Sequence, residues 1–140
     1  MRDGGKGHDM KNKISLLSFT SSDREWLGIL LADKDVRKYL SHLTSDVDVF
    51  VHDMEIAEHK GLAKLWIVRL EERGIGFISI YDLTENPFVF YAMLPSFRNK
   101  GYMKRAIKLI DSLSLPPLFS KVDKENFASL KVLMSSNIAF

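Results

Sequence analysis

Apolar residues in the first half of the chain recur at helical spacing, after one short stretch that predicts a strand. Residues 13–19 alternate imperfectly between apolar and polar side chains, as a strand does. Ser22 and Glu25 have the spacing of a capping box, so we expect a helix to begin there. Two apolar stripes follow, and a further helix is expected over 51–60, ending at Gly61. The stripes are Trp26, Leu27, Leu30 and Leu31, then Val36, Tyr39, Leu40 and Leu43.

The second half changes to short apolar runs separated by turns. Runs at 65–70, 75–82 and 88–94 are joined by short polar connections, which predicts an antiparallel meander. The third run is apolar on both faces, as is typical of a strand covered on both sides.

An amphipathic helix is expected after Gly101, then a strand at 118–122 and a last helix over 126–135. Only the stretch 88–122 has to be a crossover between parallel strands. The predicted order is β-α-α-β-β-β-α-β-α, an α+β fold with a mixed, mostly antiparallel central sheet and helices on both faces.

Composition is that of an ordinary globular protein. The 140 residues are 46% hydrophobic and 27% charged, enough for one compact domain. We expect residues 1–11, with three glycines and no apolar signal core, to be a flexible leader, and 12–140 to be the domain. No stretch reaches the roughly 18 to 20 apolar residues of a membrane span, so no membrane partner is expected.

The chain contains no cysteine. This excludes disulfides, thiolate metal sites and an acyl-cysteine intermediate, and it fits a reducing cytoplasm. The four histidines show no ligand spacing, so no metal site is expected. A net charge of +2 gives little support for nucleic-acid binding. A local basic cluster does exist, at Arg98, Lys100, Lys104, Arg105 and Lys108.

The turn at Gly101 is a candidate anion site. It joins a strand to a helix, whose first amides have no intrahelical partner and carry partial positive charge. Gly101 lets a ligand approach the backbone, and Arg98 and Lys100 would add charge-assisted bonds. Taken alone, the pattern more often marks an ordinary turn on a solvated surface.

Two segments resemble signatures of the GNAT acyltransferase family. Residues 98–103, Arg-Asn-Lys-Gly-Tyr-Met, resemble its Arg/Gln-x-x-Gly-x-Gly/Ala loop, with Pro95 before it. About thirty residues later, the segment around Asn126 looks like the second signature, in which an asparagine opens the last helix. Residues 22–40 and 74–80 resemble the subgroup of ribosomal-protein N-terminal acetyltransferases. The resemblance covers nearly all of the chain from residue 12 onward.

The resemblance implies acetyl-CoA as co-substrate. Backbone groups near Tyr91 and Met93 would pair with the pantetheine arm, amides of 99–103 would hold the pyrophosphate, and Asn126 and Ser129 would face the thioester. The implied cofactor-binding residues are Tyr91, Met93, Arg98, Asn99, Lys100, Gly101, Tyr102, Met103, Asn126 and Ser129. For Asn126 the alternative is a helix N-cap, a position that asparagine favours.

The implied reaction is direct attack of a primary amine, on a peptide, a protein N-terminus or a small molecule, on the acetyl thioester. It needs a neutral amine, a proton acceptor and an oxyanion donor, for which the N–H near Met93 is the natural candidate. The proton acceptor stays open among Asp82, Glu85, Tyr81, Tyr91 and Glu125, each of which is also an ordinary surface or packing residue. The alternative function is a non-catalytic CoA-binding or regulatory module.

Several positions depart from the family pattern. Met103 replaces glycine or alanine, and its place in the apolar stripe predicts that it turns into the core. Phe88 and Phe90 stand where the subgroup often has an acidic residue and a glycine, so a carboxylate base expected there is missing. Asn137 takes the place of a helix-ending glycine, and we expect it to be left-handed. The chain stops at Phe140, which predicts an exposed sheet edge and either a homodimer through that edge or a weakened, non-catalytic domain.

Overall fold

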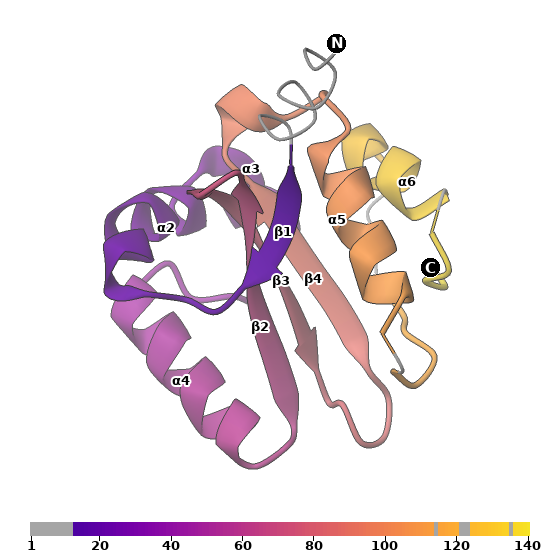
Figure 1. The fold of residues 1–140 in the computed structure, drawn as a ribbon, viewed down its shortest axis with the longest axis horizontal. Coiled ribbons are helices and arrows are strands. Elements are labelled where there is room, and N and C mark those ends of the chain that lie inside the picture. Colours follow the sequence, from indigo (N-terminus) through magenta and orange to yellow (C-terminus); the bar gives the residue numbers. More distant parts are fainter. Residues whose placement is uncertain (1–12, 114, 121–123, 135) are drawn as a thin grey trace, which may run out of the picture.

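The computed structural model describes residues 13–113, 115–120, 124–134 and 136–140 and has the predicted α+β architecture (Figure 1). The predicted leader, 1–11, lies outside the described residues. In chain order the elements are β1 Ile14–Leu17, the 3₁₀ helix η1 Ser21–Asp23, α2 Arg24–Leu31, α3 Lys34–Tyr39, α4 Val47–His59, β2 Ala63–Leu70, β3 Arg73–Tyr81, β4 Phe88–Met93, the 3₁₀ helix η2 Pro95–Phe97, α5 Tyr102–Asp111 and α6 Phe127–Met134.

The central sheet is antiparallel through β1, β2, β3 and β4, in that order, which confirms the predicted meander. It becomes mixed beyond β4, where Phe119 forms parallel bridges to Phe88 and to Ala139. The crossover from β4 is therefore parallel, as predicted. Within the described residues the expected strand at 118–122 is only a bridge at Phe119, because 121 and 122 lie outside them.

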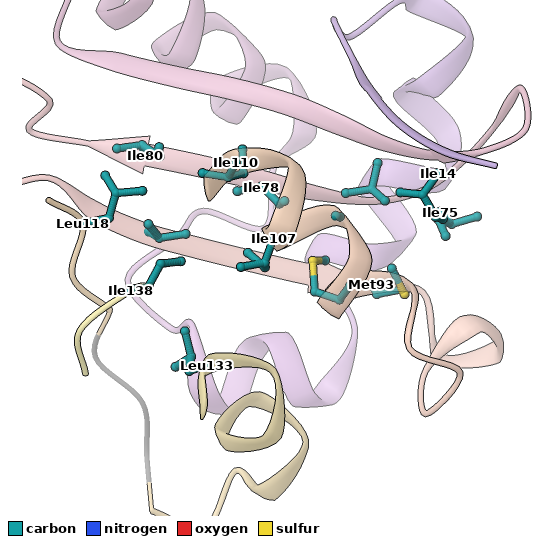
Figure 2. Close-up of a cluster of buried hydrophobic side chains, with 14 residues drawn as sticks. Ile14, Ile75, Ile78, Ile80, Met93, Ile107, Ile110, Leu118, Leu133 and Ile138 are labelled. Atoms are coloured by element: carbon teal, nitrogen blue, oxygen red, sulfur yellow. The ribbon is translucent and has the colours of Figure 1, made fainter. Parts of the chain in front are cut away.

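Helices cover both faces of the sheet, as predicted, because side chains alternate between the faces of each strand. On one face, Ile67 and Phe77 pack with buried residues of α2 and α4. On the other, Ile78 and Ile80 pack with buried residues of α5 and α6, and Figure 2 shows this second cluster closing over the sheet. The strand β3 is buried along nearly its whole length, so the two cores share it.

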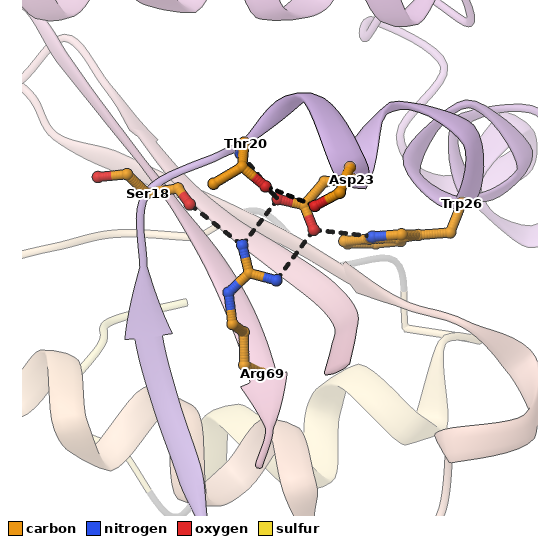
Figure 3. Close-up of polar contacts among 6 residues, drawn as sticks. Ser18, Thr20, Asp23, Trp26 and Arg69 are labelled. Atoms are coloured by element: carbon orange, nitrogen blue, oxygen red, sulfur yellow. Dashed lines mark hydrogen bonds and ion pairs between the residues drawn. The ribbon is translucent and has the colours of Figure 1, made fainter. Parts of the chain in front are cut away.

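The capping box begins two residues earlier than the sequence predicts. The Thr20 N–H donates to Oδ2 of Asp23 at 2.8 Å, whereas Ser22 and Glu25 are exposed. Asp23 also accepts hydrogen bonds from Arg69, a residue of β2, as Figure 3 shows. This long-range ion pair holds the Asp23 carboxylate beside Thr20, so the prediction at Ser22 was wrong.

Three α-helices separate β1 from β2, one more than the predicted order contains. The second apolar stripe is not one helix, because α3 ends at Tyr39 and Leu43 lies buried in the turn that follows. The next helix, α4, begins at Val47 rather than at 51, because Asp46 caps it by accepting two backbone N–H bonds.

The end of the chain also differs from expectation at one position. Among the described residues, non-glycine positive φ angles occur at Glu71, Asp82 and Asn99, so the left-handed conformation predicted for Asn137 is not adopted. After α6 the chain instead extends beside the residues around Phe119. The Ser120 N–H donates to the Ala139 carbonyl at 2.8 Å.

Candidate functional site

A cleft of about 640 Å³ opens along the edge of β4, between α3 on one side and α6 on the other. We call it the β4 cleft. Its lining includes nearly all the residues that the resemblance implied for the cofactor, with Lys100 outside it. Those in the lining are Tyr91, Met93, Arg98, Asn99, Gly101, Tyr102, Met103, Asn126 and Ser129.

The backbone of β4 turns hydrogen-bonding groups toward this cleft. Val89 directs its groups away from β3, because its N–H donates to the Phe119 carbonyl at 2.7 Å and its carbonyl accepts from the Ser120 hydroxyl at 3.0 Å. Backbone direction repeats every second residue in a strand, so Tyr91 and Met93 present their groups to the same edge, where the Met93 carbonyl already accepts a bond from Arg98. An extended ligand could therefore pair with this edge as an added strand would.

The loop that leads into α5 has two left-handed residues. Asn99 has φ 63° and Gly101 has φ 81°, and Gly101 is the N-cap of α5. A Cβ atom added at Gly101 would meet no protein atom within 4 Å, so its backbone faces open space. Met103 is buried in the core under α5, as the stripe predicted. The loop therefore exposes the first amides of a helix at one end of the cleft.

The α6 wall is tied to β4 by a hydrogen bond between side chains. The Tyr91 hydroxyl lies 2.5 Å from the Ser129 hydroxyl oxygen, across 38 positions of sequence. Burial raises the pKa of Tyr91 to about 12, so its hydroxyl is a neutral donor at physiological pH. The Asn126 side-chain oxygen accepts the Ser129 N–H at 3.3 Å, the N-cap alternative for this residue, while Asn126 also lines the cleft.

Arg98 takes a position that the sequence did not indicate. Its Nε donates to the Met93 carbonyl at 2.8 Å, and its two terminal nitrogens each donate at 2.9 Å, to Asp35 and to Asp33. Burial alone would raise the pKa of Asp33, but the hydrogen bond and charge of Arg98 hold it below its usual value. In this structure the guanidinium thus joins the loop to α3, and a phosphate contact by Arg98 stays a prediction.

The predicted proton-acceptor candidates do not gather at one place. Asp82 and Glu85 lie in the turn between β3 and β4, outside the cleft lining, whereas Glu125 lines the cleft. Tyr91 is bonded to Ser129, and the Tyr81 ring packs against Phe90 with centroids 5.3 Å apart.

His42 is a further candidate for the proton acceptor. From the sequence, the histidines are assessed only as metal ligands. The ring centroid of His42 lies 4.3 Å from that of Phe90, on the face of β4 that carries α3. Burial, and then the charge of Arg37, lower the pKa of His42, which favours the neutral imidazole. The sequence held no signal for this residue, because its neighbour Phe90 is 48 positions away.

Other classes of site find little support in the described part of the chain. No group of three histidine or carboxylate side chains there could hold a metal ion. Nor does any helix in it combine the length and the apolar character that crossing a bilayer demands.

The chain matches one protein-family model over most of its length. That model, the acetyltransferase (GNAT) domain, matches residues 13–137. No curated protein matches the chain in sequence at a significant level.

Several solved structures share the fold. An acetyltransferase from Salmonella typhimurium that modifies the N-terminal serine of ribosomal protein L7/L12 has a TM-score of 0.73 at 17% identity, over 89% of this chain and 80% of that one. Mycobacterium smegmatis RimJ in complex with CoA-disulfide has a TM-score of 0.71 at 17% identity, over 86% of this chain and 68% of that one. Spermidine N-acetyltransferase from Vibrio cholerae, in complex with CoA and spermine, has a TM-score of 0.70 at 14% identity, over 86% of this chain and 78% of that one.

Proposed function

Because the chain belongs to the GNAT family of acetyltransferases, we propose that it transfers an acetyl group from acetyl-CoA directly to a primary amine. The observation that carries this proposal is the β4 cleft, in which the outward edge of Tyr91 and Met93 leads to the left-handed turn at Gly101. Structures of the same fold are described as complexes with CoA, which supports CoA as the ligand of this cleft.

The cleft offers a place for each part of the cofactor. The backbone amides of 99–103, which lead into the N-terminus of α5, donate hydrogen bonds to the pyrophosphate. Lys100 and Lys104 add positive charge beside it. The pantetheine arm lies along Tyr91 and Met93, in the manner of an added strand. Asn126 and Ser129 border the arm from the α6 side.

The acceptor amine reaches the thioester from the Phe90 face, because the Tyr91 side chain, bonded to Ser129, occupies the α6 side. The amine nitrogen bonds to the acetyl carbon, the carbon–sulfur bond breaks, and the CoA thiolate leaves. A backbone N–H at Met93 stabilises the oxyanion, and His42 accepts the proton that the amine loses. An α-amino group, with a pKa of about 8, needs less help than a lysine at about 10.4, so we favour a peptide N-terminus or a small amine of similar pKa.

One observation favours the second candidate function, a CoA-binding module without turnover. Phe88 and Phe90 are apolar, and the Phe88 ring lies 6.3 Å from that of Phe119, so the start of β4 carries no carboxylate. Release of free thiol from acetyl-CoA, measured with a panel of amines, separates the two functions. Binding of CoA without thiol release would leave the module as the function.

A substitution at the turn tests the cofactor site itself. Gly101→Val places a branched side chain at φ 81° in the open space of the cleft, and we expect it to weaken CoA binding at least about tenfold in calorimetric titration. Gly61→Val is the matched control, because Gly61 has φ 73°, equally open surroundings and a place outside the cleft. Wild-type affinity in Gly101→Val would show that the phosphate site is elsewhere.

Two coarser properties complete the proposal. We propose a reducing cytoplasm as the compartment, because the chain has no cysteine to oxidise. We also propose that a second copy pairs with the sheet edge beside Ala139, where the described part of the sheet ends.

A further inference from the structure

We propose that Arg98 is a positioning residue that couples the phosphate loop to α3, so that cofactor binding and the acceptor-side wall of the cleft depend on one guanidinium. The inference rests on the proposed CoA site. Arg98 begins the loop that contains Asn99 and Gly101, and its partners Asp33 and Asp35 lie 65 and 63 positions earlier.

We call the hydrogen bonds of Arg98 to Met93, Asp33 and Asp35 the Arg98 clamp. Three nitrogens of the guanidinium each donate a bond, to Met93, Asp33 and Asp35, in the planar fork that suits carboxylates. The Arg98 and Asp33 side chains are only 25% and 15% exposed, so water and salt screen this pair less than a surface pair. A phosphate that bound the guanidinium directly would have to compete with two carboxylates already in contact with it.

The clamp connects two walls of the cleft. Asp33 is the N-cap of α3, and Val36 and Tyr39 of this helix line the cleft together with its C-cap, Leu40. The loop after Arg98 must hold left-handed backbone at two residues to present its amides. A ligand that stabilises the loop therefore stabilises the position of α3, and an ordered α3 stabilises the loop, because coupling between binding sites is reciprocal.

Removal of the two carboxylate charges distinguishes this role from direct phosphate binding. If Arg98 bound the pyrophosphate, Asp33→Asn with Asp35→Asn would free the guanidinium, remove negative charge near the anion and strengthen CoA binding. If Arg98 positions the loop, the same change loosens the clamp and weakens binding. Asparagine is as good an N-cap as aspartate, so the start of α3 is kept.

The chain contains a matched control. Asp46 and Asp48 occupy the same two positions at the start of α4, the N-cap and the second helical residue, and Asp48 also pairs with an arginine, Arg24. This pair is exposed and outside the cleft lining. The double variant Asp46→Asn, Asp48→Asn removes the same charge from the same helix positions without touching the clamp.

The experiment is calorimetric titration with CoA alone, together with hydrogen exchange of the α3 amides. We expect Asp33→Asn, Asp35→Asn to weaken CoA about tenfold, Asp35→Asn alone to weaken it about threefold, and the α4 control to stay within about twofold of wild type. We also expect CoA to protect 34–39 from exchange in the wild type and much less in the clamp variant.

Unchanged or tighter binding in the Asp33→Asn, Asp35→Asn variant would overturn the inference, as would equal protection of α3 in both proteins. Asp35→Asn keeps the α3 cap entirely, so its CoA affinity decides between the two roles of Arg98 should the double variant unfold. A wild type that fails to bind CoA would instead overturn the proposed function, which makes the two failures distinguishable.

Discussion

At the scale of single residues, the contact between His42 and Phe90 places an imidazole on the face of β4 that carries α3, beside the β4 cleft rather than in its lining. Burial lowers the pKa of His42, because it penalises the charged form, and Arg37 repels the added proton. The native state therefore binds fewer protons at this residue than the unfolded chain does. The contribution of His42 to stability is complete above its ordinary pKa of 6.5. It is lost as the pH falls from 6.5 through the lowered pKa of the native state.

We expect the NMR titration of His42 to give a pKa below 6.5, and Phe90→Ala to bring it back toward 6.5 by removing the ring that partly shields the imidazole from water. If His42 accepts the proton of the amine, kcat/KM falls as the pH drops through this pKa, and His42→Gln lowers kcat about 100-fold. A His42→Gln enzyme with unchanged kcat and an unchanged acid limb would exclude the imidazole from the reaction.

At the scale of elements, a buried ion pair fastens η1 and α2 to β2 (Figure 3). The Asp23 carboxylate accepts bonds from two Arg69 nitrogens at 2.9 and 2.7 Å and from the Trp26 indole at 3.0 Å. Gly74 on β3 lies against that indole, since a Cβ atom there would come within 2.5 Å of the Trp26 ring. The start of α2 is thus positioned by two strands as well as by the local bond between Thr20 and Asp23.

We expect Asp23→Ala to lower the free energy of unfolding by about 3 kcal/mol or more in urea denaturation, because it leaves the Arg69 charge buried and unpaired. Asp48→Ala is the control. It breaks the exposed pair with Arg24 and should change the free energy of unfolding little. Similar losses in the two variants would contradict the role of burial.

The same pair makes stability depend on pH. Burial by itself would raise the pKa of the Asp23 carboxyl. The hydrogen bonds from Arg69, Thr20 and Trp26 outweigh burial and lower this pKa from 3.8. The native state then binds fewer protons than the unfolded chain, so the contribution is complete above pH 3.8 and is lost as the pH falls below it. Asp23→Asn should therefore flatten the acid limb of the stability curve.

At the scale of the whole molecule, the C-terminal part of the chain, α6 and the segments beside it, exposes apolar side chains. Phe119, Phe127, Met134 and Phe140 are between 40% and 74% exposed, and Figure 1 shows the C-terminus beside α6. Ala139 directs its N–H and carbonyl to the segment at 118–120, so by alternation the groups of Phe140 face away from it. Exposed apolar surface of this kind favours association with a second copy, in line with the proposed pairing.

We expect sedimentation to detect a dimer whose dissociation constant rises at least about tenfold in Phe140→Lys, because a charge at a sheet edge opposes pairing. Leu17→Lys is the control, since Leu17 is also exposed but ends β1, at the opposite edge of the sheet. A wild type that stays monomeric at all concentrations would rule out pairing at this edge.

Features with a local physical cause could be predicted from the sequence. The runs that became β2, β3 and β4 alternate with turn residues, and the burial of Met103 follows from its place in the stripe of α5. The turn at Gly101 was indicated by a glycine between basic residues and by its resemblance to a family signature, and the structure places it in a cleft with Tyr91 and Asn126. Helix boundaries failed where a capping choice depended on a distant partner, as at Thr20.

The sequence by itself determined the antiparallel strands of the meander, the faces they bury and the strand–turn–helix at Gly101, because these depend on spacings of two to four residues. Only the tertiary structure decided that Arg98 binds Asp33, that Asp23 binds Arg69, and that Tyr91 bonds to Ser129 in the lining of the cleft. Each of these contacts joins residues at least 38 positions apart. Such pairs are selected by how the sheet and helices pack, and no local pattern records them.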